Sequence, residues 1–199
     1  FDDIIKQDPD SWDAHRLKSD FLLKSKGDLE GALKSCDRSI EILKNLEKEK
    51  QRPNREKEMM ITKAILLKKI AYKENRHSES SIRKLKEAIE ILDIVIEKDE
   101  ENKDAIIEKG NCFWNLDNFV KAEECFQAAL ELDPNNEQTL VDIGDCCIEL
   151  KSFTDADIFF QRSLKIDNLY LPAILGAAQV DYGLKEYEDA LEKYQKILD

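Results

Sequence analysis

The sequence predicts an all-α solenoid, which is a stack of antiparallel helix pairs. Alanine recurs at an interval of 34 residues, at Ala88, Ala122, Ala156 and Ala190. A large apolar residue follows each alanine by four positions: Leu92, Phe126, Phe160 and Tyr194. The chain is also 37% charged and 42% hydrophobic, with only six glycines and four prolines, a composition typical of long amphipathic helices. A fixed period of this length indicates a repeat architecture.

One repeat shows how the helix pair is encoded. Residues 103–116 carry apolar or small groups at a spacing of three and four, which predicts a helix: Ile106, Ile107, Gly110, Phe113 and Trp114. Residues 115–118 interrupt this pattern, and residues 119–132 predict a second helix that ends before Pro134. We expect Gly110 and Ala122 to let the two backbones approach closely, with Phe113 and Phe126 filling the space beside them.

These motifs resemble the tetratricopeptide repeat family. Residues 103–136 match the family pattern at all but one of its typical positions, Lys109, through Ile106, Gly110, Phe113, Ala122, Phe126, Ala129 and Pro134. Residues 137–170 match it through Leu140, Ile143, Gly144, Ala156 and Phe160, and residues 171–199 through Ile174, Ala177, Ala178, Ala190 and Tyr194. The resemblance implies a right-handed α-solenoid whose first helices line a concave groove that binds peptides.

The resemblance also predicts how the chain divides. We expect a single array in six parts: the end of a preceding repeat (1–10), an irregular repeat (11–52), an extended repeat (53–102), two regular repeats (103–136 and 137–170) and a truncated repeat (171–199). In the irregular repeat Ala32 is the expected small contact, and its second helix runs toward Leu46. Helices are expected over residues 55–74 and 81–98, although the pattern leaves the register of residues 47–80 undefined. Residues 1–10 are similar to residues 126–135, so we expect a segment of a longer array.

Composition and charge exclude several classes of function. The net charge of −12 repels nucleic-acid backbones. Residues 44–86 hold 14 Lys or Arg against 6 Asp or Glu, but acidic residues interleave with the basic ones, so we interpret this segment as solvated helix ends. Its basic residues include Lys48, Lys50, Arg52, Arg55, Lys57, Lys68 and Lys69. No apolar stretch is long enough to span a membrane.

Cysteine and histidine give no support for catalysis, a metal or a cofactor. The five cysteines are odd in number and lack C-x-x-C spacing, which argues against a disulfide framework or a zinc site and favours a cytoplasmic location. Cys112 and Cys146 occupy the same repeat position, which predicts packing. His15 and His77 are the only histidines, and a Cys–His pair is the one catalytic arrangement left open. We therefore expect a protein that is not an enzyme.

The resemblance assigns the groove to one stripe of the first helices. In this chain the stripe contains Ile107, Asn111, Trp114, Asn115, Val141, Asp145, Ile148, Glu149, Leu175, Gln179 and Tyr182, with Leu17 and Phe21 as less regular members. Apolar residues recur along it, and Trp114 is the strongest contact candidate because aromatics anchor interfaces. The alternative for each residue is burial by a neighbouring helix. Asp145 and Glu149 predict a preference for an amphipathic partner with basic residues.

Three functions remain open at this point. The first is a protein-binding scaffold, the second a self-assembly module that forms homo-oligomers, and the third a regulatory arm of a larger enzyme or transporter. The family members that hold the EEVD tail of chaperones use cations and asparagines in the groove, whereas this chain has Ile107, Asp142, Pro172 and Gly176 at positions where those residues stand. EEVD tails are therefore not expected as partners. The asparagine ladder of the sugar-transferase repeats is missing as well.

Overall fold

The computed structural model describes residues 1–46, 53–75 and 77–198, and these residues form helices without any strand. The predicted all-α solenoid is thereby confirmed as a succession of helices, in which each of α1 to α4 (within residues 2–73) and each of α7 to α10 (within residues 119–184) packs against the helix that follows it. The chain divides into two compact units, Phe1–Glu108 and Lys109–Asp199, with the division inside one helix. Within the described ranges, no helix is long and apolar enough to cross a membrane.

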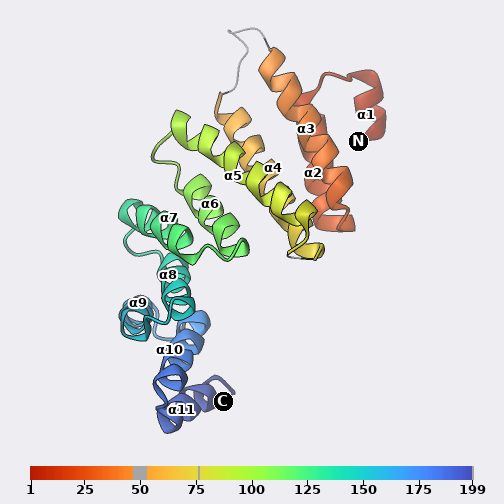
Figure 1. Ribbon diagram of the computed structural model, residues 1–199. Helices are drawn as coiled ribbons and strands as arrows, with labels where there is room; N and C mark the ends of the chain where they lie inside the picture. Colours follow the sequence, from red (N-terminus) through yellow and green to blue (C-terminus); the bar gives the residue numbers. More distant parts are fainter. Residues whose placement is uncertain (47–52, 76, 199) are drawn as a thin grey trace. The chain divides into compact units, whose positions relative to one another are not determined.

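The described residues of the first unit form five α-helices, one π-helical turn and the start of a further helix, whose order can be followed in Figure 1. They are α1 (Asp2–Gln7), α2 (Trp12–Phe21) with a π-helical turn (Leu22–Lys26), α3 (Leu29–Asn45), α4 (Pro53–Lys73), α5 (Glu79–Lys98) and the beginning of α6 (Lys103–Asn115). Gly27 ends the π-helical turn in the left-handed conformation, at φ +61°, which glycine adopts without steric cost. The Ser11, Asp28 and Ser78 side chains each accept a backbone N–H in the first turn of α2, α3 and α5, respectively.

The long helices expected in this unit are confirmed. α3 extends to Asn45, and α4 and α5 each begin two residues before the expected position. Proline suits the first position of α4 because that position has no helical partner for an N–H. Ala32 is fully buried, as expected for a small contact residue, and its carbonyl accepts a hydrogen bond from the Ser19 hydroxyl. Lys48, Lys50 and Arg52, and the end of the irregular repeat predicted for 11–52, lie outside the described residues.

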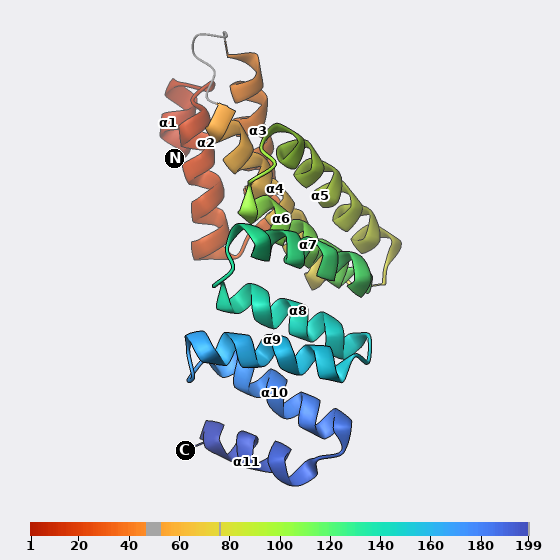
Figure 2. The same cartoon turned by 90° about the vertical axis from the view of Figure 1, so that its left-hand side faces the viewer.

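The second unit contains the remainder of α6 and five further helices, α7 (Phe119–Leu132), α8 (Glu137–Glu149), α9 (Phe153–Ile166), α10 (Leu171–Leu184) and α11 (Tyr187–Leu198). Each of α7 to α10 packs against the helix that follows it, and α8 also contacts α10 (Figure 2). The predicted pairing of residues 103–116 with 119–132 is confirmed. A Cβ on Gly110 would lie 2.6 Å from the ring of Phe126, which is 1% exposed.

The same packing principle holds between successive repeats. Phe160 of α9 is fully buried, and its ring lies directly against Gly144 of α8 and Gly176 of α10. The ring lies so close to both glycines that neither position has room for the methyl group of an alanine. One phenylalanine thus joins two first helices, which places α8 and α10 side by side and sets the spacing of the candidate groove.

Candidate partner-binding groove

The predicted groove residues fall mainly in the second unit. Ile107 belongs to the first unit, where it is half-buried, and the other ten lie on α6, α8 and α10 of the second unit. Five of these ten are half-buried: Asn111, Trp114, Asn115, Asp145 and Ile148. Four are exposed: Glu149, Leu175, Gln179 and Tyr182. The second unit therefore presents nine of the predicted residues at least in part to solvent.

Val141 is the exception. Its side chain is 3% exposed, so it belongs to the core, and the predicted contact with a partner at this position is corrected. The helix that carries Val141, α8, packs against α7, α9 and α10, and these are the helices that can cover its side chain. Leu175, at the same repeat position in α10, is 37% exposed. We accordingly leave Val141 out of the groove.

A small cavity is lined by residues of α6, α7 and α8. Its volume is about 160 Å³, and its lining contains Asn111 and Trp114 of α6, Phe126 of α7, and Asp142 and Asp145 of α8. Asn111 and Trp114 are three residues apart on one helix, as are Asp142 and Asp145 on the other, so each pair occupies one face of its helix. The cavity thus combines two aromatic rings, an amide and two carboxylates.

Asp145 is the most unusual titratable group of this cavity. Burial, together with the negative charges of Asp142 and Glu149, raises the pKa of its carboxyl to about 7. Among the described residues, no hydrogen bond or ion pair joins Asp145 to another side chain or to the backbone. Asp142, by contrast, accepts a hydrogen bond from Gln138 Nε2 at 2.8 Å. Asp145 therefore offers an acceptor that the fold itself does not use.

Two of the predicted groove residues, Trp114 and Tyr182, each pack against another aromatic ring. The rings of Trp114 and Phe119 lie edge to face with centroids 5.0 Å apart. Tyr182 and Tyr187 lie in a similar arrangement at 5.5 Å, and the Tyr182 side chain is 64% exposed. Each groove aromatic is therefore oriented by an aromatic residue near the start of the following helix, which limits its freedom before any partner binds.

In the first unit, the two less regular members of the predicted stripe are both exposed. Leu17 is 39% exposed and Phe21 is 41% exposed. Phe21 also contacts Phe1, with ring centroids 5.6 Å apart. The structure thus places Leu17 and Phe21 on a surface of α2, and their role in binding stays a prediction.

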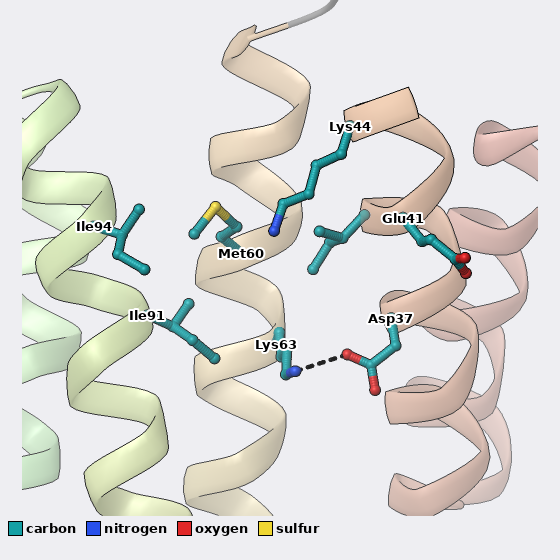
Figure 3. A pocket seen from close by; sticks show the side chains of 8 residues that line it. Asp37, Glu41, Lys44, Met60, Lys63, Ile91 and Ile94 are labelled. Atoms are coloured by element: carbon teal, nitrogen blue, oxygen red, sulfur yellow. Dashed lines mark ion pairs between the residues drawn. The ribbon is translucent and has the colours of Figure 1, made fainter. Parts of the chain in front are cut away.

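A second cavity, of about 320 Å³, lies in the first unit and was missed by the sequence analysis (Figure 3). Residues of three helices line it: Asp37, Ile40, Glu41 and Lys44 of α3, Met60 and Lys63 of α4, and Ile91 and Ile94 of α5. Lys63 Nζ forms ion pairs with Asp37 at 2.8 Å and with Glu87 at 3.3 Å. Its lining residues occupy no common repeat position, so the periodicity could not have predicted it.

Most of the cysteines are buried, and His15 is hydrogen-bonded to the backbone. Cys36, Cys112, Cys146 and Cys147 are buried, and Cys125 is half-buried. Burial raises the pKa of Cys36 to about 12 and that of Cys147 to about 11, so both remain thiols at neutral pH. The His15 ring hydrogen-bonds to the Pro9 carbonyl at 3.1 Å. In the ranges 1–46, 53–75 and 77–198, no three His, Cys, Asp or Glu side chains are grouped to hold a metal ion.

One helix pair of this chain matches a known protein family. The family model described as tetratricopeptide repeat matches residues 104–136, which include the pair α6 and α7. Residues 104–136 form a tetratricopeptide repeat. No curated protein matches this chain over its sequence.

Solved structures show the same fold at low sequence identity. PilW, described as a widely conserved type IV pilus biogenesis factor, has a TM-score of 0.76 at 16% identity, over 98% of this chain and 80% of PilW. A tetratricopeptide repeat protein from Parabacteroides merdae has a TM-score of 0.74 at 16% identity, over 94% of this chain and 66% of that protein. YrrB, described as having an unusual peptide-binding site, has a TM-score of 0.63 at 18% identity, over 99% of this chain and 90% of YrrB.

Proposed function

We propose that this protein binds a segment of another protein in the groove formed by α8, α10 and the adjoining part of α6. The partner segment is amphipathic and carries basic residues. The observation that carries the proposal is the row of accessible apolar side chains on successive first helices, Trp114, Ile148, Leu175 and Tyr182, with Asp145 and Glu149 beside it. A row of this kind in a groove is typical of peptide recognition.

The composition of the row sets the chemistry of the partner. Its apolar members would cover the apolar face of a peptide, and the carboxylates would pair with basic side chains. The same carboxylates would repel the acidic EEVD tails of chaperones, which supports the expectation that these tails are not partners. The peptide-binding site in the description of YrrB supports the use of this fold for peptides, although YrrB shares only 18% identity with this chain.

The proposal is tested by selecting peptides from a displayed library against the whole chain and measuring their affinity by fluorescence anisotropy. Tyr182→Ala is the informative variant because its side chain is 64% exposed and its loss leaves the core intact. Ile158→Ala is the matched control, since Ile158 is 54% exposed but lies on α9, a second helix. We expect at least a tenfold loss for Tyr182→Ala and less than a twofold change for Ile158→Ala. Equal losses, or a loss confined to Ile158→Ala, would refute the groove.

Self-assembly is a second candidate because the last helix pair exposes several large apolar side chains. Leu184, Tyr187 and Leu191 are 46%, 57% and 57% exposed. In this case the groove, or the surface of α11, receives another copy of the chain. Light scattering at rising protein concentration tests it. A dimer that Leu191→Glu converts to a monomer would support self-assembly, and a monomer at every concentration would exclude it.

The proposed compartment is the cytoplasm. The four buried cysteines are free thiols and serve packing, which suits a reducing environment. A role as the regulatory arm of a larger enzyme or transporter remains a proposal that only the complete gene product can test.

A further inference from the structure

We infer that the cavity of Asn111, Trp114, Phe126, Asp142 and Asp145 is a subsite for one arginine side chain of the partner. The guanidinium pairs with the Asp145 carboxylate, and the rest of the side chain lies against the Trp114 ring. The inference rests on the proposed function, since the arginine belongs to the segment bound in the groove. It adds a named position and a single chemistry to that proposal.

The geometry of the lining favours a planar cation. Carboxylates stand on α8 and an indole ring and an amide stand on α6, so a group that enters between the helices meets acceptors on one side and an aromatic ring on the other. Guanidinium fits both, because its fork of N–H donors matches carboxylates and its flat face stacks on aromatic rings. An ammonium group has neither feature and is expected to bind more weakly.

The size and the charge of the cavity agree with this occupant. A volume of about 160 Å³ corresponds to roughly five water molecules at about 30 Å³ each, which is enough for the end of a long side chain but not for a folded ligand. Asp145 is without an internal partner among the described residues, so a bound cation would give it the hydrogen bonds that it lacks. An anion would meet two carboxylates instead.

The protonation of Asp145 gives the subsite a pH dependence. Asp142 and Glu149 of its own helix raise the pKa of Asp145 together with burial, whereas Asn111, Trp114 and Phe126, which line the cavity from α6 and α7, carry no charge. With the pKa at about 7, the carboxyl is largely neutral at pH 6 and largely ionised at pH 8. An arginine side chain is cationic throughout, so its binding is expected to tighten over this interval.

A small probe tests the subsite without a known partner. Nα-acetyl-arginine methylamide is titrated into the whole chain while the two tryptophan indole N–H signals are followed by NMR. We expect a saturable shift of the Trp114 signal and none for Trp12, which lies in the first unit and serves as an internal reference. The citrulline analogue has nearly the same shape without the charge, and we expect at least tenfold weaker binding from it. The lysine analogue should fall between the two.

Variants then assign the effect to one carboxylate. Asp145→Asn should weaken the arginine probe at least tenfold and abolish its pH dependence, whereas Asp157→Asn, on α9, should change neither. Equal binding of arginine and citrulline, equal shifts of both indoles, or full binding by Asp145→Asn would overturn the subsite. The comparison of arginine with citrulline uses the unaltered chain. It therefore tests the subsite even if a variant fails to fold.

The two proposals fail in different ways. If selected peptides bind the groove but the arginine probe does not shift Trp114, the subsite is wrong and the groove stands. If the probe binds as expected but no selected peptide depends on Tyr182, the cavity takes arginine and the longer groove is wrong.

Discussion

At the scale of single residues, close packing of glycine against phenylalanine determines how neighbouring helices meet. Gly176 leads to a direct prediction. Its substitution by alanine places a methyl group against the fully buried Phe160 ring, and we expect destabilisation of about 1–3 kcal/mol from overpacking. Chemical denaturation of both proteins measures the difference.

Gly31→Ala is the matched control for that experiment. It makes the same chemical change in helix α3, but the added methyl group would meet only the flexible Asp28 side chain. We expect a smaller loss, or a gain from the better helix propensity of alanine. A larger loss at Gly31 than at Gly176 would contradict the packing account.

Asp145 provides a second prediction, on stability and pH. Its pKa is raised from 3.8 to about 7 in the folded state, so between these values the folded chain binds more protons than the unfolded chain. The contribution of Asp145 to the free energy of unfolding therefore falls as the pH rises from about 4 to 7 and stays low above that. Asp145→Asn removes this penalty.

Denaturation at pH 4 and at pH 8 measures the effect. We expect Asp145→Asn to match the unaltered chain at pH 4 and to exceed its stability at pH 8. The gain is limited to about 4 kcal/mol, because one unit of pKa is worth about 1.4 kcal/mol, and solvent in the cavity reduces it. Asp157→Asn should show no such pH-dependent gain. A variant that is less stable than the unaltered chain at pH 8 would show that Asp145 has a stabilising partner.

At the scale of helices, the ends are defined by caps that differ from repeat to repeat. Asn136 Oδ1 accepts hydrogen bonds from the Thr139 backbone N–H at 2.9 Å and from the Thr139 hydroxyl at 3.0 Å. Asn136→Ala should therefore destabilise the chain by about 1 kcal/mol. Thermal unfolding followed by circular dichroism measures it.

Ser152 is the corresponding control, because it precedes α9 but its side chain makes no capping hydrogen bond. Ser152→Ala should change the stability by less than about 0.5 kcal/mol. If the two substitutions have the same effect, the cap at Asn136 contributes no more than the general preference for serine or asparagine at this position.

Helix positions in this chain are largely predictable from sequence, and the exceptions have physical reasons. Spacing of apolar residues predicted both helices of the pair α6 and α7 and the long helix α3. The π-helical turn at Leu22–Lys26 was not predicted, because it depends on one left-handed residue, Gly27, and leaves the apolar spacing of α2 almost unchanged. The starts of α4 and α5 were misplaced by two residues, since polar first turns carry no periodic signal.

At the scale of the whole molecule, the repeat predicts which helices are neighbours better than it predicts which side chains stay accessible. Val141 and Leu175 occupy equivalent positions, yet the first is buried and the second is 37% exposed. The family pattern assigns the same role to both positions, so it does not contain this difference in burial. The cavity beside Lys63 escaped prediction for the same reason, since irregular positions on three helices form it.

The stripe of candidate groove residues is a prediction from the sequence, whereas the cavity on it was found only in the structure. Sequence alone placed Trp114 and Asp145 on one stripe. Only the structure shows that these two residues share a cavity and that Asp145 lacks a partner among the described residues. The stripe predicts only a general binding surface, whereas the cavity beside Trp114 and Asp145 supports the proposal of a subsite for an arginine side chain.

The most direct test of the groove compares two isoleucine methyl groups by NMR while a selected peptide binds. Ile148 lies on the first helix α8, and Ile158 lies on the second helix α9. If the first helices form the binding surface, the Ile148 δ1 methyl signal shifts with the same dissociation constant as the peptide, and the Ile158 signal stays in place. A shift of Ile158 with Ile148 unchanged would contradict the account.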